Sequence, residues 1–201
     1  MLNGPIWNKL PRFALPVAAT AILEQLFNAS DVAVVGNFAG DAAEKTAAVA
    51  AVGANTAIIG LIVNLFVGIA LGANVVIANA IGRDDKDAVH RAVHTSILVA
   101  LLGGAAIAVI GELIAGTLLH SLNVPDDVYP LALLYLRIYL LGIPAAAMYN
   151  YGNGVLSAAG DTKNPLYILT IAGVVNVILN LFFVIVCRLG VAGVALASAI
   201  S

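Results

Sequence analysis

Three polar residues recur at helical spacing inside an apolar stretch near the start of this 201-residue chain. Glu24, Asn28 and Asp31 are four and then three residues apart, which places them on one face of a helix. Residues 13–38 around them are long enough to cross a bilayer. A carboxylate at that depth costs about 3 kcal/mol or more and usually handles an ion or a substrate. Asp31 is therefore the residue best placed for chemistry.

A second polar stripe lies near the other end of the chain. Asn176 and Asn180 are four residues apart within an apolar stretch, so they also share a helix face. Amide side chains often hold membrane helices together by hydrogen bonds, and this structural explanation remains open for both asparagines. It does not account for Asp31, because a structural hydrogen bond needs no charge.

Counting 1.5 Å per residue from the predicted helix ends places four polar residues at similar depths, ~10 to 13 Å below the outer surface. They are Asp31, Tyr135, Asn180 and Ser198. All offer oxygen, which suits a hard monovalent cation or a proton and gives nothing that a soft metal prefers. We therefore predict a cation-binding or coupling site at Asp31, with no metal beyond Na⁺. Asn176 lies about a turn further inward and belongs to the same predicted site. A secondary polar path is predicted at Glu24, Asn28, Asn150 and Asn153.

The composition predicts an integral membrane protein. The chain is 62% hydrophobic and only 10% charged, far more apolar than a soluble domain of this length requires. Its formal net charge of −2 gives no reason to expect nucleic acid as a partner. Cys187 is the only cysteine, which excludes an intramolecular disulfide and a cysteine-based metal cluster.

The fold class predicted from hydropathy is an all-α, polytopic helical bundle. Five apolar stretches cover about residues 13–38, 47–81, 95–121, 129–158 and 165–187, and a sixth covers 191–201 in part. Each complete stretch reaches the roughly 20 residues of a spanning helix. We expect residues 1–201 to form one transmembrane lobe whose sixth helix is truncated, the first half of a larger transporter. Pro16 is the expected hinge of the first helix.

The placement of basic residues predicts the orientation. With a cytoplasmic N-terminus, the predicted inner segments hold six Lys and Arg residues and the outer segments hold two. The inner residues are Lys9, Arg12, Arg83, Lys86, Arg91 and Lys163, and the outer ones are Lys45 and Arg188. We expect a multi-pass protein of the cell membrane with its N-terminus inside.

From about residue 10 to residue 201 the sequence resembles the multidrug and toxic compound extrusion (MATE) transporters. The resemblance rests on the order and spacing of several short motifs rather than on any one of them. They are Pro16 with Asp31-x4-Gly36, Gly53-Ala-Asn with Gly68-x3-Gly72, Gly82-Arg-Asp, Tyr135-Leu-Arg with Gly142-Ile-Pro144, Gly160-Asp-Thr-Lys-Asn-Pro165, Asn176-x3-Asn180 and Gly190-Val-Ala-Gly193-Val-Ala-Leu-Ala-Ser198.

The resemblance implies a twelve-helix protein of two six-helix lobes, with this chain as the N-terminal lobe. Such proteins export small organic cations and drugs in exchange for Na⁺ or H⁺ and use no other cofactor. Some carry a first-lobe cation site similar to Asp31, Asn176, Asn180 and Ser198 here, with a tyrosine like Tyr135 nearby. The position of Asn180 is commonly aspartate in those members, so this chain departs from them by one carboxylate.

Other functions fit the sequence less well. A lipid-linked sugar flippase of the same superfamily needs a basic cavity for pyrophosphate, and only Arg137 lies deep in the predicted helices. A non-transporting membrane scaffold fragment remains an alternative for this chain alone. An intramembrane enzyme would need a nucleophile and base or a metal-ligand set, and neither is evident. His90 and His94 are spaced like metal ligands but have no obvious third partner, so we expect a charged loop there.

Overall fold

The computed structural model describes residues 6–201, and for residues 6–9 and 12 it describes the backbone alone. Its helices are α1 (Ile6–Phe38), α2 (Ala42–Gly82), α3 (Lys86–Ser121), α4 (Tyr129–Ala158), α5 (Lys163–Leu181) and α6 (Val191–Ile200). A short π-helix, η1 (Phe182–Val186), continues α5. This all-α bundle confirms the predicted fold class.

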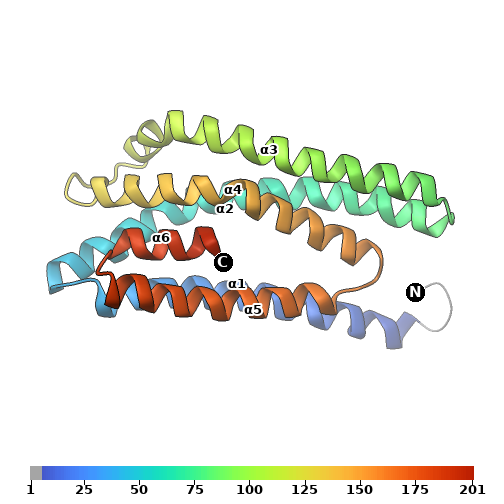
Figure 1. Cartoon of the computed structure of the whole chain (residues 1–201), viewed down its shortest axis with the longest axis horizontal. Coiled ribbons are helices and arrows are strands. Elements are labelled where there is room, and N and C mark those ends of the chain that lie inside the picture. The colour runs from blue at the N-terminus through green and yellow to red at the C-terminus, as the bar shows by residue number, and fades with distance from the viewer. Residues whose placement is uncertain (1–5) are drawn as a thin grey trace.

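The helices run up and down in two groups that α6 joins. Figure 1 shows α2, α3 and α4 together, and α1 beside α5, with α6 between α4 and α5. The start of α1, the α2–α3 turn and the α4–α5 turn lie at one end of the bundle. Figure 1 also shows α4 changing direction partway along its length, and Pro144 lies in the interior of this helix. A proline there removes a backbone hydrogen bond and kinks the helix.

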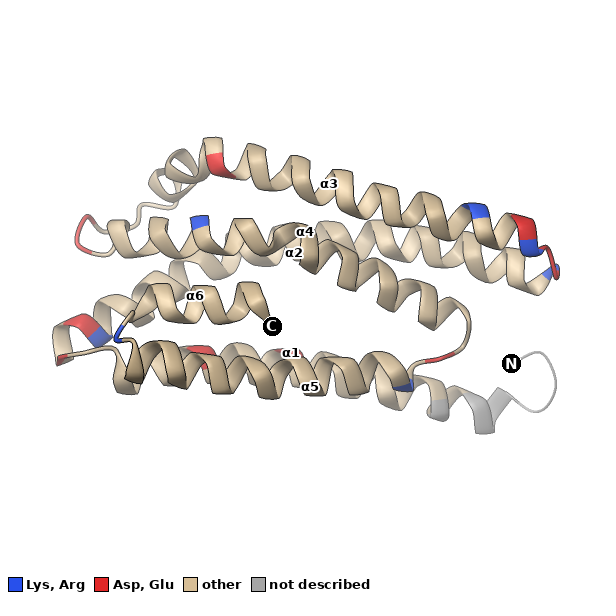
Figure 2. Cartoon of the chain, in the orientation of Figure 1, with Lys and Arg blue, Asp and Glu red and all other residues tan. Residues whose placement is uncertain are grey.

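Within residues 6–201, four helices are long and apolar enough to cross a membrane: α2, α3, α4, and α5 together with η1. We expected five. At 33 residues α1 is long enough, but its polar residues, Glu24 and Asp31 among them, make it less apolar than the other four. Figure 2 shows most of the charged residues near the ends of the helices.

Two helices begin earlier than hydropathy predicts, because aspartates cap them outside the apolar stretches. The Asp41 carboxylate accepts hydrogen bonds from the backbone N–H groups of Ala43 and Glu44, so α2 starts at Ala42 rather than near residue 47. Asp85 accepts from the N–H of Ala88 at 2.9 Å, so α3 starts at Lys86 rather than near residue 95. The expectation of a charged loop around His90 and His94 is therefore wrong, because both residues lie in the first three turns of α3.

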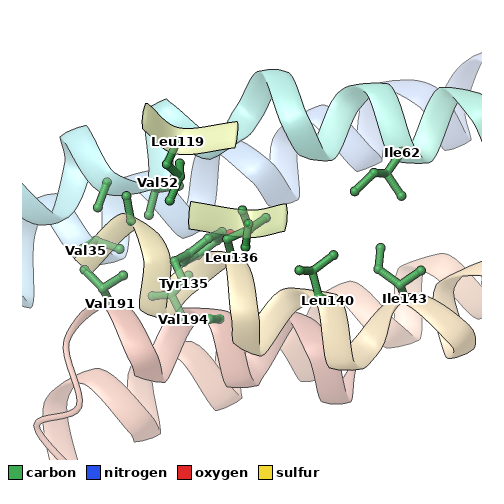
Figure 3. Close-up of a cluster of buried hydrophobic side chains, with 14 of the residues drawn as sticks. Val35, Val52, Ile62, Leu119, Tyr135, Leu136, Leu140, Ile143, Val191 and Val194 are labelled. Carbon is green, nitrogen blue, oxygen red and sulfur yellow. The ribbon is translucent and has the colours of Figure 1, made fainter. Parts of the chain in front are cut away.

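Close helix contacts depend on small residues, as is usual where lipid gives no hydrophobic drive for association. A Cβ on Gly104 of α3 would lie 2.8 Å from the Pro144 Cα of α4, and one on Gly142 of α4 would lie 3.0 Å from the Ala199 Cα of α6. Figure 3 shows the resulting core around Leu136 and Leu140 of α4. α4 thus lies at the centre of the bundle.

Candidate cation-coupling site

The Asp31 carboxylate is buried and held by two other helices. Asn180 Nδ2 on α5 donates to Asp31 Oδ1 at 2.6 Å, and Ser198 Oγ on α6 donates to Asp31 Oδ2 at 3.0 Å. Asp31 is 7% exposed and Asn180 is fully buried. Each carboxylate oxygen therefore accepts from a different helix, and a single charged group joins α1, α5 and α6.

Asn176 extends this network along α5. Asn180 Nδ2 also donates to Asn176 Oδ1 at 2.9 Å, and Asn176 Nδ2 donates to Ser201 Oγ at 3.3 Å. The hydrogen bonds thus form one chain of polar side chains from Ser201 to Ser198. Four of the five residues predicted for the site are therefore linked one to the next by hydrogen bonds: Asn176, Asn180, Asp31 and Ser198.

Tyr135, the fifth, approaches the same cluster from α4. It is buried, and its hydroxyl lies near Asp31 and Ser198. Figure 3 shows it close to Val191 and Val194 of α6. Its ring stacks on Tyr139 one turn further along α4, with 6.3 Å between the ring centroids. Four helices therefore contribute to one polar space.

The α1–α5 contact that sets this geometry depends on Gly173. Gly173 shares a face of α5 with Asn176 and Asn180, and Phe27 lies one turn before Asp31 on α1. A Cβ on Gly173 would collide with the Phe27 ring. Because glycine has no side chain, the ring packs directly against the α5 backbone, and α1 approaches closely enough for Asp31 to reach Asn180.

The α5–α6 connection determines where Ser198 lies. The π-turn ends α5 with a hydrogen bond from the Cys187 N–H to the Phe182 carbonyl at 3.1 Å. Gly190 then adopts φ +52° and ψ −125°, a conformation that side chains other than hydrogen disfavour. The chain reverses within a few residues, so α6 returns beside α5 and Ser198 reaches Asp31.

No basic side chain pairs with Asp31 among the described residues. The ion pair found within residues 6–201 joins Arg137 to Glu112 at 3.4 Å, and both side chains are partly exposed. Asn180 Oδ1 is buried and accepts no hydrogen bond. A buried carboxylate without a basic partner, next to an unused amide oxygen, is an arrangement that a proton or a small hard cation can complete.

The residues of the predicted secondary path lie apart from this network. Glu24 and Asn28 are exposed on α1. Asn150 Nδ2 donates to the Ala146 carbonyl of its own helix at 2.9 Å, and Asn153 Oδ1 accepts from the Ser157 hydroxyl at 3.4 Å. The hydrogen bonds of these two asparagines are local to α4. Thr20 Oγ1 donates to the Pro16 carbonyl at 2.9 Å, at the position of the expected hinge.

Two residues near the site were missed from the sequence. Asn55 on α2 is fully buried, and its Nδ2 donates to the Ala132 carbonyl of α4 at 2.9 Å, one turn before Tyr135. Asn55 is part of the Gly53-Ala-Asn motif of the resemblance, but that motif does not indicate that its side chain holds α2 to α4. Tyr139 follows Tyr135 by four residues, a spacing that does indicate a shared helix face.

Comparison with known proteins agrees with this architecture. The family model MatE matches residues 16–182. The probable multidrug resistance protein YpnP of Bacillus subtilis is 30% identical over 201 residues, which cover 99% of this chain and 44% of that protein. The probable multidrug resistance protein NorM of Thermotoga maritima is 24% identical, over 98% of this chain and 42% of its own length.

A crystal structure of MATE in the bent conformation superposes with a TM-score of 0.89 at 25% identity, over 98% of this chain and 43% of that one. The chain therefore spans less than half the length of the relatives it matches. It aligns with them over nearly all of its own length, and the family match includes Asp31, Asn176 and Asn180. The chain belongs to the MatE family, the multidrug and toxic compound extrusion transporters.

Proposed function

We propose that this chain is the N-terminal lobe of an exporter that moves small organic, cationic substrates across the cell membrane in exchange for H⁺ or Na⁺. Asp31 is the coupling group in this proposal. The observation that carries it is the buried Asp31 carboxylate, which is bonded to Asn180 and Ser198 and has no basic partner among the described residues. Members of this family are transporters rather than enzymes, which agrees with the absence of a catalytic residue set in the sequence.

The hydrogen bonds around Asp31 favour H⁺ over Na⁺. Asn180 turns its N–H toward Asp31 and leaves its own oxygen without a partner. Binding Na⁺ between the two residues would require the amide to rotate and give up a charged hydrogen bond worth about 1.5–3 kcal/mol. Protonation needs only Asp31, since a protonated carboxyl group donates to a neighbouring oxygen while the Asn180 contact is kept.

Neutralising Asp31 supplies the mechanical step of the proposal. The carboxylate joins α1 to α5 and α6 through two charge-assisted hydrogen bonds, and these weaken when the charge is removed. Pro16 lacks the N–H that would complete the helix at that point, and Thr20 bonds back to its carbonyl, which also bends helices. α1 thus has a place to bend when the Asp31 contacts loosen, and such a bend would reshape the substrate cavity that the family resemblance implies between the two lobes.

The membrane orientation in this proposal has the N-terminus in the cytoplasm. Figure 2 shows basic residues at the end of the bundle that holds the α2–α3 turn, and Arg83, Lys86, Arg91 and Lys163 lie in or next to the two turns at that end. Short loops rich in Lys and Arg stay on the cytoplasmic side. The flippase alternative is less favoured, because the side chain of Arg137 pairs with Glu112 and both are partly exposed.

The test is Asp31→Asn in the full-length protein reconstituted into liposomes. The amide keeps the size and most hydrogen bonds of the carboxylate but cannot cycle between charged and neutral forms. We expect the protein to insert and fold, and substrate efflux under an ion gradient to fall to the level of empty vesicles. Asp84→Asn, the same change on the exposed α2–α3 turn, is the matched control. Efflux at the unmodified rate by Asp31→Asn would exclude Asp31 as the coupling residue. A lack of flux by the unmodified protein would favour the scaffold alternative.

A further inference from the structure

The surface shared by α3 and α4 carries a pair of opposite charges. Arg137 Nε on α4 lies 3.4 Å from Glu112 Oε2 on α3, and the two side chains are 55% and 33% exposed. A guanidinium group carries five N–H donors and a carboxylate carries two acceptor oxygens. Because this contact uses one nitrogen and one oxygen, most of that capacity is open to a ligand from outside the bundle.

The pair lies near the edge of the hydrocarbon core of the membrane. Arg91 is on the same helix as Glu112, 21 positions earlier, and the residues between them include no Asp, Glu, Lys or Arg. At 1.5 Å per residue this separation is about 31 Å, close to the ~30 Å thickness of a hydrocarbon core. With Arg91 at the inner edge, Glu112 lies at the outer edge, within reach of lipid headgroups. This is the outer leaflet in the orientation proposed above.

Exposed apolar side chains lie next to the pair on the side toward the membrane centre. Val109 is one turn before Glu112 on α3 and is 62% exposed. Leu141 is one turn after Arg137 on α4 and is 73% exposed. Figure 1 shows α3 and α4 packed side by side, so the two apolar residues belong to one surface. That surface suits the acyl chains of a lipid.

An aromatic residue marks the outward side of the pair. The Tyr129 hydroxyl approaches Gly116, where a Cβ would lie 3.0 Å from it, and Gly116 is one turn beyond Glu112 on α3. Tyrosine is enriched at membrane–water interfaces, where its ring lies at the level of the headgroups. From the membrane centre outward the surface therefore presents apolar side chains, a pair of charges and a phenol, which matches acyl chains followed by a headgroup.

The charges of the pair sum to zero, which favours a zwitterionic headgroup over an anionic one. Arg137 offers planar N–H donors to a phosphate, and Glu112 offers an oxygen to an ammonium group. In phosphoethanolamine a two-carbon linker keeps the ammonium close to the phosphate, just as the two side chains lie close together. Its ammonium group has three N–H donors, whereas the trimethylammonium group of phosphocholine has none.

We propose that Glu112 and Arg137 bind the headgroup of phosphatidylethanolamine in the outer leaflet, with the phosphate on Arg137 and the ammonium on Glu112. The acyl chains of the lipid lie along Val109 and Leu141. The headgroup supplies partners for two charges that otherwise face hydrocarbon, where a charge is costly. This site is separate from Asp31 and involves no coupling ion.

The test is native mass spectrometry of the full-length protein in detergent, offered equal amounts of phosphatidylethanolamine, phosphatidylcholine and phosphatidylglycerol with identical acyl chains. We expect the unmodified protein to retain phosphatidylethanolamine at least about tenfold over phosphatidylcholine, because only the former donates a hydrogen bond to Glu112. Arg137→Gln should lower the retention of phosphatidylethanolamine at least about tenfold. Glu112→Gln leaves Arg137 free for an anionic headgroup, so phosphatidylglycerol should then be retained over phosphatidylethanolamine.

Arg188→Gln and Asp126→Asn are the matched controls, because both residues are exposed and lie in turns at the end of the bundle opposite the α2–α3 turn. Both variants should keep the preference of the unmodified protein. Equal retention of phosphatidylethanolamine and phosphatidylcholine by the unmodified protein would overturn the site, whether or not the variants fold. An equal loss in Arg188→Gln would also overturn it.

A dimer in place of bound lipid, lost in Arg137→Gln, would contradict the lipid proposal and assign the pair to a second copy of the chain. None of these results bears on Asp31, so the two proposals fail separately.

Discussion

Gly173→Ala is expected to impair transport although glycine and alanine differ by one methyl group. The new Cβ would collide with the Phe27 ring, so α1 must move away from α5. Overpacking of this kind costs about 1–3 kcal/mol. Asn180 Nδ2 lies 2.6 Å from Asp31 Oδ1, and a shift of about 1 Å takes this pair beyond hydrogen-bonding distance. The free-energy cost corresponds to a factor of roughly 5 to 150 in the population of the intact site.

The assay is substrate efflux from liposomes containing the full-length variant, together with its thermal unfolding in detergent. We expect efflux to fall at least about fivefold, the lower end of that range. Shrinking the opposing ring should relieve the collision, so Gly173→Ala combined with Phe27→Leu should recover part of the lost efflux. Recovery in the double variant is the sign of a direct contact, because independent sites show additive effects.

Gly103→Ala serves as the matched control, since a Cβ there meets no atom within 4 Å. It should transport at the unmodified rate. Unmodified efflux by Gly173→Ala would refute the claim that the Phe27–Gly173 contact positions Asp31. Equal losses in the Gly173→Ala and double variants would show that the effect does not pass through Phe27.

Two further predictions concern the neighbours of the site. Asn180→Asp adds a second negative charge beside Asp31 and should shift the ion preference of the transporter from H⁺ toward Na⁺. The measurement is substrate efflux from liposomes with a pH gradient and a sodium gradient imposed separately. If a sodium gradient alone drives efflux by the unmodified transporter, the inferred preference for protons is wrong. Asn55→Ala removes the hydrogen bond to the Ala132 carbonyl and should lower the free energy of unfolding by about 1–3 kcal/mol, measured by thermal unfolding. Asn28→Ala, at an exposed position, is the control and should change the free energy of unfolding little. Equal effects of the two variants would contradict the role of the α2–α4 contact.

Hydropathy predicted the bundle because the requirement for about 20 apolar residues per span is written into consecutive sequence. It placed the starts of α2 and α3 too late, because Asp41 and Asp85 continue helices into water through local hydrogen bonds that a hydropathy count ignores. The π-turn after Asn180 has no sequence pattern of its own, and it follows from how α5 and α6 pack.

Counting residues from the predicted helix ends placed Asp31, Asn180 and Ser198 at similar depths in the membrane, because the rise per residue fixes the height of a side chain along a helix. Depth gives no direction around the helix axis. The polarity of Asn150 and Asn153 alone suggested a secondary path, and the hydrogen bonds of these two residues remain within α4. Direction depends on which helices touch. That is determined by contacts such as Phe27 on Gly173, which only the folded chain shows.

Proton movement tied to substrate movement is the most direct test of Asp31 as the coupling group. Liposomes that contain the full-length protein and an enclosed pH-sensitive dye would be given a substrate gradient and no ion gradient. We predict that substrate flow drives protons in the opposite direction in the unmodified protein and that Asp31→Asn shows no such proton flow. Proton counterflow of equal size in Asp31→Asn would contradict the account.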